Sequence, residues 1–285
     1  MRLLVTGELV GEQAMLDLVG ALGDLRRAHR LDLVVTIADN VAITGPSPSD
    51  GSGMTLRQRD VLLAAGIDLI LTGTHVWDGG HGRVVVDHPQ VVRSANLVDD
   101  ALRPGRGRVD LTVDGDPLTV LQLADRSARG SVVRSPFEAW QGQLTRPATL
   151  VHLIGTPYAA LRFAHAVDGR CAAVIGSLTH VASRELQVLP RGTAFVADIG
   201  YVGPAGGIGG FEPTHFVAEY LDGDASALGP YRLRPGPTQF SGVLLETGAA
   251  GAVVELAWVL SLDPAVPAVP MSPAWDLRTP QPGPA

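Results

Sequence analysis

Short apolar runs alternate with longer helical patterns through the first 72 residues, and this alternation most constrains the fold. Residues 3–6, 33–37 and 68–72 are rich in Leu, Ile and Val and have the length of buried strands. Between them, residues 12–29 and 56–65 carry apolar side chains at helical spacing. This β-α-β-α-β order predicts a mostly parallel sheet with helices covering both of its faces.

The middle of the chain has a different pattern. Residues 109–113 and 118–123 flank the dipeptide Asp114-Gly115, which is typical of a tight β-hairpin. Further strands are expected over residues 148–154, 172–175, 193–199, 239–246 and 252–260, and helices over 157–167 and 213–221. We therefore predict an α/β fold with α+β-like character, in which two mixed β-sheets face each other and helices flank them.

No internal repeat and no domain boundary is evident in residues 1–262, which are expected to form a single domain. Residues 263–285 carry repeated Pro and little periodicity, which predicts a frayed or disordered tail. Residues 45–53 are rich in Gly, Pro, Ser and Asp and are expected to form a loop. This loop is either a lid over a site or a tolerated surface insertion.

Charge and hydropathy exclude several classes of protein. The net charge is −7, and all 22 basic residues are Arg, which argues against a general nucleic-acid surface. No apolar run reaches the ~18 residues of a membrane span, and no secretory signal pattern is present, so a cytoplasmic protein is expected. The single cysteine, Cys171, lies in an apolar run and is expected to be a buried structural thiol.

Polar side chains gather where several expected strands end. Because the carboxyl ends of parallel strands meet at one edge of a sheet, these side chains are expected to lie together. Two carboxylates, an amide and an imidazole could bind a divalent ion such as Mn²⁺, Fe²⁺ or Zn²⁺, and a second imidazole could face a substrate phosphate. The residues are Glu8, Asp39, Asn40, Thr74, His75 and His180.

Each of these residues taken alone also has an ordinary structural explanation. Glu8 and Asp39 could cap the helices that follow them, and Asn40 could bond within its own turn. A histidine after a strand is more often a satisfied polar group than a metal ligand. Only the combination of residues, in this order, favours a functional site.

The order and spacing of six segments resemble those of a known family. They are Gly7-Glu8-Leu9-Val10-Gly11, Ile37-Ala38-Asp39-Asn40, Gly73-Thr74-His75-Val76-Trp77-Asp78, Arg93-Ser94-Ala95-Asn96, Gly176-Ser177-Leu178-Thr179-His180-Val181 and Asp198-Ile199-Gly200-Tyr201-Val202-Gly203-Pro204. From Met1 to about Leu260, the chain resembles the YmdB-type branch of the calcineurin-like metallophosphoesterases. The resemblance implies the metallophosphoesterase sandwich fold and a two-metal phosphodiesterase that acts on small substrates such as 2′,3′-cyclic nucleotides.

The resemblance also implies the ligands of each metal. The first metal takes the positions of Glu8, Asp39, Asn40 and His180, all of which carry donor atoms. The second metal takes Asp39 and three positions that here hold Thr74, Leu153 and Leu178. Since leucine has no lone pair and a threonine hydroxyl is a poor ligand, one divalent ion is expected rather than two. His152 adjoins Leu153, but adjacent strand residues face opposite sides unless a bulge intervenes.

The resemblance makes His75 the general acid or the group that orients the phosphate, although it could instead be a structural histidine bonded to a backbone carbonyl. Three interpretations follow. The first is a metal-dependent phosphoesterase that hydrolyses small phosphodiesters or cyclic nucleotides slowly, with one ion. The second is a catalytically silent member that binds a nucleotide, a metal ion or a protein. The third is a subunit that keeps the fold for homo-oligomer assembly.

Overall fold

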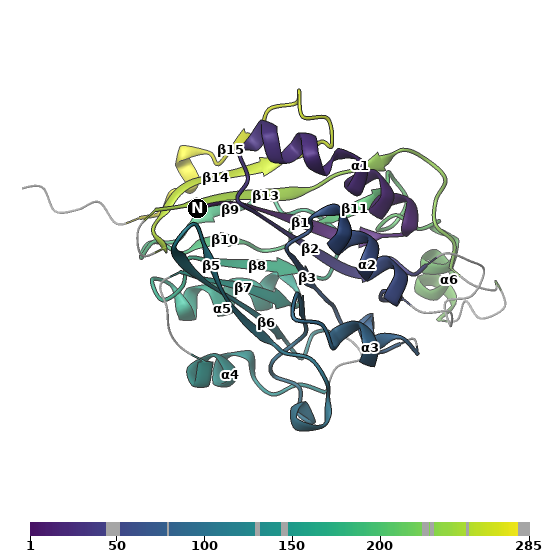
Figure 1. Ribbon diagram of the computed structural model, residues 1–285. Helices are drawn as coiled ribbons and strands as arrows, with labels where there is room; N and C mark the ends of the chain where they lie inside the picture. Colours follow the sequence, from purple (N-terminus) through teal and green to yellow (C-terminus); the bar gives the residue numbers. More distant parts are fainter. Residues whose placement is uncertain are drawn as a thin grey trace, which may run out of the picture.

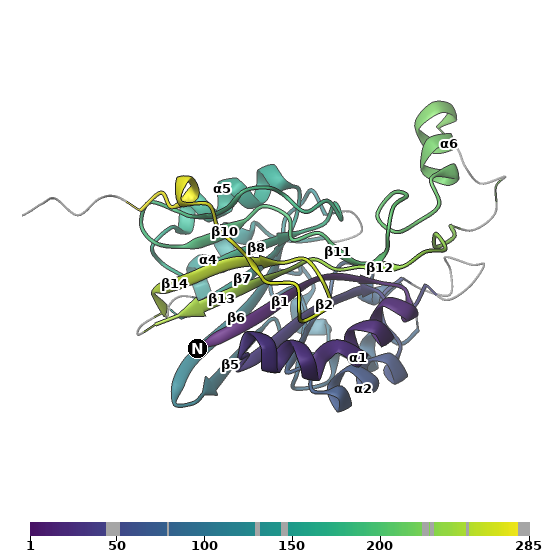
Figure 2. The ribbon, with the colours of Figure 1, turned by 90° about the horizontal axis from the view of Figure 1, so that it is seen from above.

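Two β-sheets pack face to face, and helices cover the outer faces of both, so that the protein has four layers (Figures 1 and 2). The computed structural model describes residues 1–43, 52–78, 80–128, 132–143, 148–223, 228, 231–248 and 251–278. This architecture confirms the predicted class of two facing mixed sheets with flanking helices.

The first sheet has nine strands, and its central strand is β1 (Arg2–Val10). Parallel to β1 lie β2 (Leu33–Asn40), β3 (Leu69–Leu71), β4 (Val91–Val92) and β11 (Tyr201–Pro204). Antiparallel pairing joins β13 (Gly242–Thr247) to β1, β14 (Val253–Val259) to β13, β15 (Val269–Pro270) to β14, and β12 (Thr238–Gln239) to β11. The outer face is covered by α1 (Glu12–His29), α2 (Leu56–Ala65) and α3 (Gly82–Val86).

The second sheet has six strands in the order β5-β6-β7-β8-β10-β9. Their bounds are β5 Arg108–Val113, β6 Asp116–Ala124, β7 Thr149–Ile154, β8 Ala173–Ser177, β9 Leu186–Val188 and β10 Ala194–Val196. Its outer face carries α4 (Pro136–Gln143) and α5 (Pro157–Val167). A further helix, α6 (Thr214–Asp222), projects from the body of the molecule beyond the end of β11 (Figure 2).

Side chains alternate between the two faces of each strand, and this alternation divides the core into layers. On β7, Leu150 belongs to the cluster between the sheets, whereas Val151 and Leu153 belong to the cluster beneath α4 and α5. Because successive side chains of a strand point to opposite faces, His152 and Ile154 point toward the facing sheet, as Leu150 does. This register decides which residues of β7 can reach a site between the sheets.

Several predicted elements agree with the structure. The helices predicted over residues 12–29, 56–65 and 157–167 are α1, α2 and α5. The hairpin of β5 and β6 turns on Asp114 and Gly115, whose φ angles of 50° and 90° are those of a two-residue type I′ turn. Cys171 is buried, as expected. The short strands β4, β9, β11 and β12, and helices α3 and α4, were not predicted.

Part of the Pro-rich C-terminal segment departs from the expected disorder. Val269–Pro270 forms β15 and pairs with β14, and Asp276 forms an isolated bridge with Val188. Proline is tolerated there because β15 lies at the edge of the sheet. Residues 279–285 and residues 44–51, which make up most of the predicted 45–53 loop, lie outside the described residues. The assignment of residues 1–262 to one domain stays a prediction.

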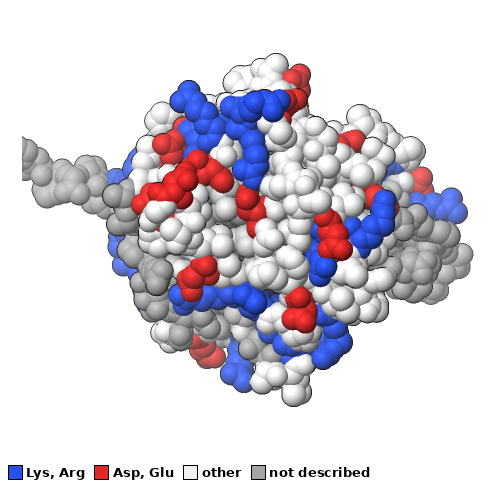
Figure 3. All heavy atoms as spheres, viewed as in Figure 1, with Lys and Arg blue, Asp and Glu red and all other residues white. Residues whose placement is uncertain are grey.

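Two surface properties bear on possible partners. On the face shown in Figure 3, Arg residues are interspersed with Asp and Glu, so this face is not uniformly basic. In the part of the chain that the structure describes, no helix is both long enough and apolar enough to span a membrane.

Candidate active site

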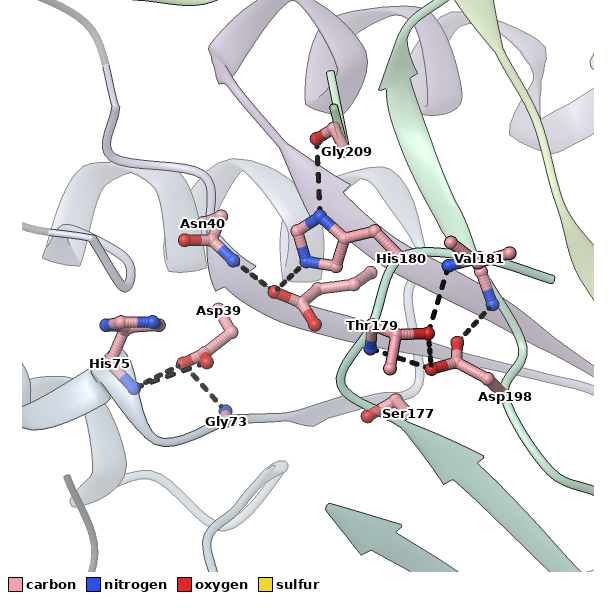
Figure 4. Close-up of polar contacts among 12 residues, drawn as sticks. Asp39, Asn40, Gly73, His75, Ser177, Thr179, His180, Val181, Asp198 and Gly209 are labelled. Atoms are coloured by element: carbon pink, nitrogen blue, oxygen red, sulfur yellow. Dashed lines mark hydrogen bonds and ion pairs between the residues drawn. The ribbon is translucent and has the colours of Figure 1, made fainter. Parts of the chain in front are cut away.

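A cavity of about 390 Å³ lies where the carboxyl ends of β1, β2 and β3 meet the segment that follows β8. Its polar lining contains all six residues predicted from the strand ends, namely Glu8, Asp39, Asn40, Thr74, His75 and His180. The parallel order of the first sheet brings the first five together. His180 comes from the facing sheet and reaches them because the two sheets pack against each other (Figure 4).

Two of these side chains converge on a carboxylate oxygen of a third. The amide of Asn40 donates a hydrogen bond to Oε1 of Glu8, and Nε2 of His180 lies 3.1 Å from the same oxygen. Nδ1 of His180 lies 3.2 Å from the carbonyl oxygen of Gly209, and its ring stacks on Tyr201. The bond to Gly209 fixes the ring so that Nε2 faces Glu8, which is the orientation that a metal-ligating histidine adopts.

Burial and mutual attraction set the charges of this pair. Burial by itself raises the pKa of Glu8, but His180 lowers it below its ordinary value. Burial lowers the pKa of His180, but Glu8 outweighs this effect and raises it to about 9. If Nδ1 of His180 holds a proton for Gly209, then a second proton or a metal cation must lie between Nε2 and the carboxylate. The pair therefore shares either a proton or a cation.

Asp39 adds a second buried carboxylate to the site. It accepts hydrogen bonds of 2.9 Å from the backbone amides of Gly73 and His75. Burial, together with the nearby charge of Glu8, raises the pKa of Asp39 to about 7. Two carboxylates that share a buried space repel each other unless one of them is protonated or a cation lies nearby. Asp39 therefore also favours a bound cation.

His75 is paired with Asp78, the acidic residue that ends the same resembling segment of the sequence. Nδ1 of His75 lies 2.5 Å from Oδ2 of Asp78, within and just after the 3₁₀ helix His75–Trp77. Burial lowers the pKa of His75, but Asp39 and Asp78 outweigh it and raise the pKa above its ordinary value. The imidazole is thus held by one nitrogen and favours its protonated form, which suits a proton donor.

A Gly73→Ala substitution is expected to disrupt the site. A Cβ at position 73 would lie 1.9 Å from Oδ2 of Asp39, and real structures do not tolerate such a contact. Asp39 would have to leave the amides of Gly73 and His75, which would cost about 1–3 kcal/mol of stability for the buried groups left unpaired. Chemical denaturation would measure this loss. A Gly80→Ala variant serves as the control, because a Cβ there meets no atom within 4 Å; equal stability of the two variants would contradict the contact.

The structure corrects the expectation for β7. Leu153 was expected at a lost metal-ligand position, but its side chain packs beneath α5 and does not line the cavity. The residue of β7 that lines the cavity is Ile154, one position further along. His152 faces the same side as Ile154 but lies deeper, with Nε2 2.8 Å from Oγ of Ser177. The apolar character inferred for this part of the site is retained, with Ile154 in place of Leu153.

The donor atoms of the site are unevenly distributed. Glu8, Asn40 and His180 meet at one point, whereas Asp39 is turned toward backbone amides. Within the described residues, no group of three or more His, Cys, Asp or Glu side chains is arranged to hold a metal ion. The neighbouring space is lined by Ile154 and Leu178, neither of which has a donor atom.

Sequence reasoning missed two parts of the site. The first is the Gly-rich loop over residues 203–210, whose Gly209 holds His180; the φ of 60° at Gly209 favours glycine there. The second is an apolar wall formed by Ile208, Phe211, Phe216 and Tyr231. The ring centroids of Phe216 and Tyr231 are 5.0 Å apart. The spacing of glycines was the only signal for the loop, and no pattern pointed to the wall.

Asp198 fixes the turn that carries His180. Its carboxylate is fully buried and accepts 2.7 Å hydrogen bonds from both the backbone amide and the hydroxyl of Thr179 (Figure 4). It also accepts a hydrogen bond of 2.8 Å from the backbone amide of Gly200. These bonds tie the end of β8 to the start of β11 and so place His180 opposite Glu8.

His152 makes the stability of the protein depend on pH. Its side chain is fully buried, and burial lowers its pKa from 6.5 to about 4, although the charge of Glu8 acts in the opposite direction. Between these values the unfolded chain binds a proton that the folded chain does not. Stability should therefore be complete above pH 6.5 and fall on acidification toward about pH 4, by about 3 kcal/mol from this residue alone.

Urea denaturation of the native protein and of a His152→Leu variant, at about pH 7 and about pH 4, measures this contribution. The difference in unfolding free energy between the two proteins should change in favour of the variant as the pH falls. A difference that stays constant across this range would show that His152 does not titrate in this way.

Comparison with known proteins gives consistent matches. The model of the YmdB-like protein family matches residues 4–257. The chain is 27% identical over 259 residues to 2′,3′-cyclic-nucleotide 2′-phosphodiesterase of Bacillus subtilis, covering 86% of this chain and 91% of that protein. The crystal structure of a hypothetical protein from Thermus thermophilus is similar with a TM-score of 0.79 and 28% identity, over 92% of this chain and 99% of that one.

A phosphatase from Mycoplasma pneumoniae has the same fold, with a TM-score of 0.82 and 21% identity over 96% of this chain and 95% of that one. These matches extend over nearly the whole chain, and the range of the family model includes the six segments that resemble the family. The chain belongs to the YmdB-like protein family.

Proposed function

We propose that the protein is a metal-dependent phosphodiesterase that acts on small phosphodiesters such as 2′,3′-cyclic nucleotides and uses one divalent ion. The observation that supports this most directly is the convergence of Asn40 and His180 on Glu8, beside His75, in one cavity. The relative from Bacillus subtilis is named for the hydrolysis of cyclic nucleotides. Mn²⁺, Fe²⁺ and Zn²⁺ all suit this mixture of carboxylate, amide and imidazole donors.

Each residue has a role in this proposal. Glu8, Asn40 and His180 would hold the ion, with Asp39 as a further carboxylate beside them. The ion would polarise the phosphoryl group and activate a water molecule for attack. His75, held by Asp78 and favouring its protonated form, would give a proton to the leaving oxygen. Thr74, which directly precedes His75 in the sequence, also lines the cavity and offers a neutral hydroxyl.

The apolar wall supports a nucleotide rather than a small alkyl phosphodiester as the substrate. Phe211, Phe216 and Tyr231 line the same cavity as the polar residues, so the cavity has one polar and one aromatic side. A nucleobase could pack against the aromatic side while the phosphate lies at the polar side. The volume of about 390 Å³ is within the range of small-molecule sites.

Hydrolysis assays with purified protein test the proposal. We expect slow turnover of 2′,3′-cyclic AMP with added Mn²⁺ and loss of turnover after treatment with EDTA. Asp39→Asn preserves an acceptor for the amides of Gly73 and His75 and should abolish turnover without unfolding the protein. Absence of turnover with each of Mn²⁺, Fe²⁺ and Zn²⁺ would contradict the proposal.

Substitution of Phe216 tests the aromatic side of the cavity. Phe216→Ala should raise KM for a 2′,3′-cyclic nucleotide about tenfold, because a stacking contact with a base is worth about 1–3 kcal/mol. KM for bis(methyl) phosphate, which has no base, should change little. Tyr220→Ala is the matched control, since Tyr220 lies on the same helix and is 88% exposed. Equal effects of Phe216→Ala on the two substrates would contradict a base-binding wall.

A second candidate function is a catalytically silent member of the family that binds a nucleotide or a partner protein. Ile154 and Leu178 line the cavity without offering a donor atom, and this favours the alternative. Nucleotide binding without turnover under every metal condition would support it. The cytoplasmic location expected from the sequence stays a prediction, and assembly into homo-oligomers stays an alternative interpretation.

A further inference from the structure

A buried serine and a buried histidine form a pair beside the polar side of the cavity. Ser177 (Figure 4) is the last residue of β8, and it lines the cavity as Leu178 does. Its Oγ lies 2.8 Å from Nε2 of His152, which is fully buried. Ile154, which pairs in register with Ser177 on the neighbouring strand, lines the same part of the cavity. The serine hydroxyl therefore lies beside two apolar residues of the lining, Leu178 and Ile154.

The tautomer of His152 decides which way the serine hydroxyl donates. Nδ1 of His152 has no hydrogen-bond partner among the described residues. If Nδ1 carried the proton, a buried N–H would be left unpaired, whereas buried acceptors are left unpaired more readily. The favoured tautomer thus carries its proton on Nε2 and donates to Oγ of Ser177. The hydroxyl proton of Ser177 is then free for another acceptor.

The same tautomer argues against Ser177 as a nucleophile. A base would have to take the hydroxyl proton on Nε2, and no carboxylate holds Nδ1 to stabilise the cation that would form. Burial already disfavours that cation, since it lowers the pKa of His152 to about 4. A hydroxyl that donates a hydrogen bond to a bound oxyanion needs no such change of charge.

We propose that Ser177 donates a hydrogen bond to a phosphoryl oxygen of the substrate, and that His152 is the positioning residue that holds its hydroxyl in that orientation. This inference rests on the proposed phosphodiesterase function and adds to it a donor in the corner that Leu178 and Ile154 line. The ligand it recognises is a phosphate or phosphodiester group.

Calorimetric binding of inorganic phosphate to the full chain, loaded with Mn²⁺, tests the assignment independently of turnover. Ser177→Ala should weaken phosphate binding about tenfold, in line with the loss of one hydrogen bond to a charged group. Ser177→Thr keeps the hydroxyl and should bind within about threefold of the native protein. His152→Leu frees the hydroxyl to rotate and should resemble Ser177→Ala. Ser94→Ala, a change at a buried serine outside the cavity, should have no effect.

Thermal unfolding of each variant separates this role from a structural one, because a folded Ser177→Ala protein with weakened phosphate binding supports the proposal. If Ser177→Ala binds phosphate as the native protein does while the native protein hydrolyses cyclic nucleotides, Ser177 has no such role and the proposed function stands. If Ser177→Thr binds phosphate as weakly as Ser177→Ala does, loss of the hydroxyl does not explain the weaker binding and the inference is wrong. If the native protein binds no phosphate, the inference is also wrong.

Discussion

Replacing Leu178 and Ile154 together with histidine should raise the number of bound divalent ions from one to two per chain and speed hydrolysis by about a hundredfold or more. Both side chains line the cavity, and each substitution adds an imidazole nitrogen where there is now only hydrocarbon. Together with Asp39 and the hydroxyl of Thr74, the two imidazoles would offer a second ion about four donors. Two ions, rather than one, would then stabilise the negative charge of the phosphoryl group in the transition state.

Elemental analysis and initial rates with 2′,3′-cyclic AMP measure the effect. Leu153→His is the matched control, because Leu153 packs beneath α5 and an imidazole there would reach no ligand in the cavity. That control should destabilise the protein by about 2–5 kcal/mol and bind no additional ion. Two ions in the control, or one ion in the double variant, would show that the faces of β7 have been assigned incorrectly.

Replacing His75 with alanine should lower kcat by about a hundredfold to ten-thousandfold, which is the usual contribution of a positioned proton donor. The pairing of Nδ1 with Asp78 leaves Nε2 for the substrate. The raised pKa keeps the imidazole protonated at a higher pH than an ordinary histidine. The native rate should therefore fall as the pH rises through the raised pKa of His75. The variant should lack that limb of the pH–rate profile.

An exposed histidine nearby provides the control for this experiment. His81 lies in the turn that precedes α3 and is not among the residues that line the cavity. His81→Ala should keep the native rate and pH profile. A His75→Ala protein with the native rate would exclude proton donation by His75. His75 would then have only a structural role.

The residues that could be predicted from the sequence are those whose position depends on local pattern and on the geometry of parallel sheets. Helical spacing in residues 12–29 fixed the ends of α1, and the ends of β1 and β2 placed Glu8 and Asp39 at one edge. His180 could be assigned to the same predicted site because it also follows a strand. The distance of 3.1 Å between Nε2 of His180 and Oε1 of Glu8 depends on how the two sheets pack, and no local sequence pattern predicts that packing.

Two features were beyond sequence reasoning for a physical reason. The cavity-lining position of β7 differs by one residue from the expected one, and a shift of one residue turns every side chain of a strand to the other face. Tyr201 and Gly209 reach the site through contacts with His180, which is distant from both in the sequence, and Phe211 lines the cavity from the same segment. Short strands such as β11 take their conformation from their partners rather than from their own residues.

The metal content of the purified protein tests the central claim most directly. After saturation with Mn²⁺ and removal of free metal, elemental analysis should find one ion per chain in the native protein and none in a His180→Ala variant, because Nε2 of His180 meets Glu8 at the proposed cation site. Two tightly held ions per chain in the native protein, or an undiminished content in His180→Ala, would contradict the account.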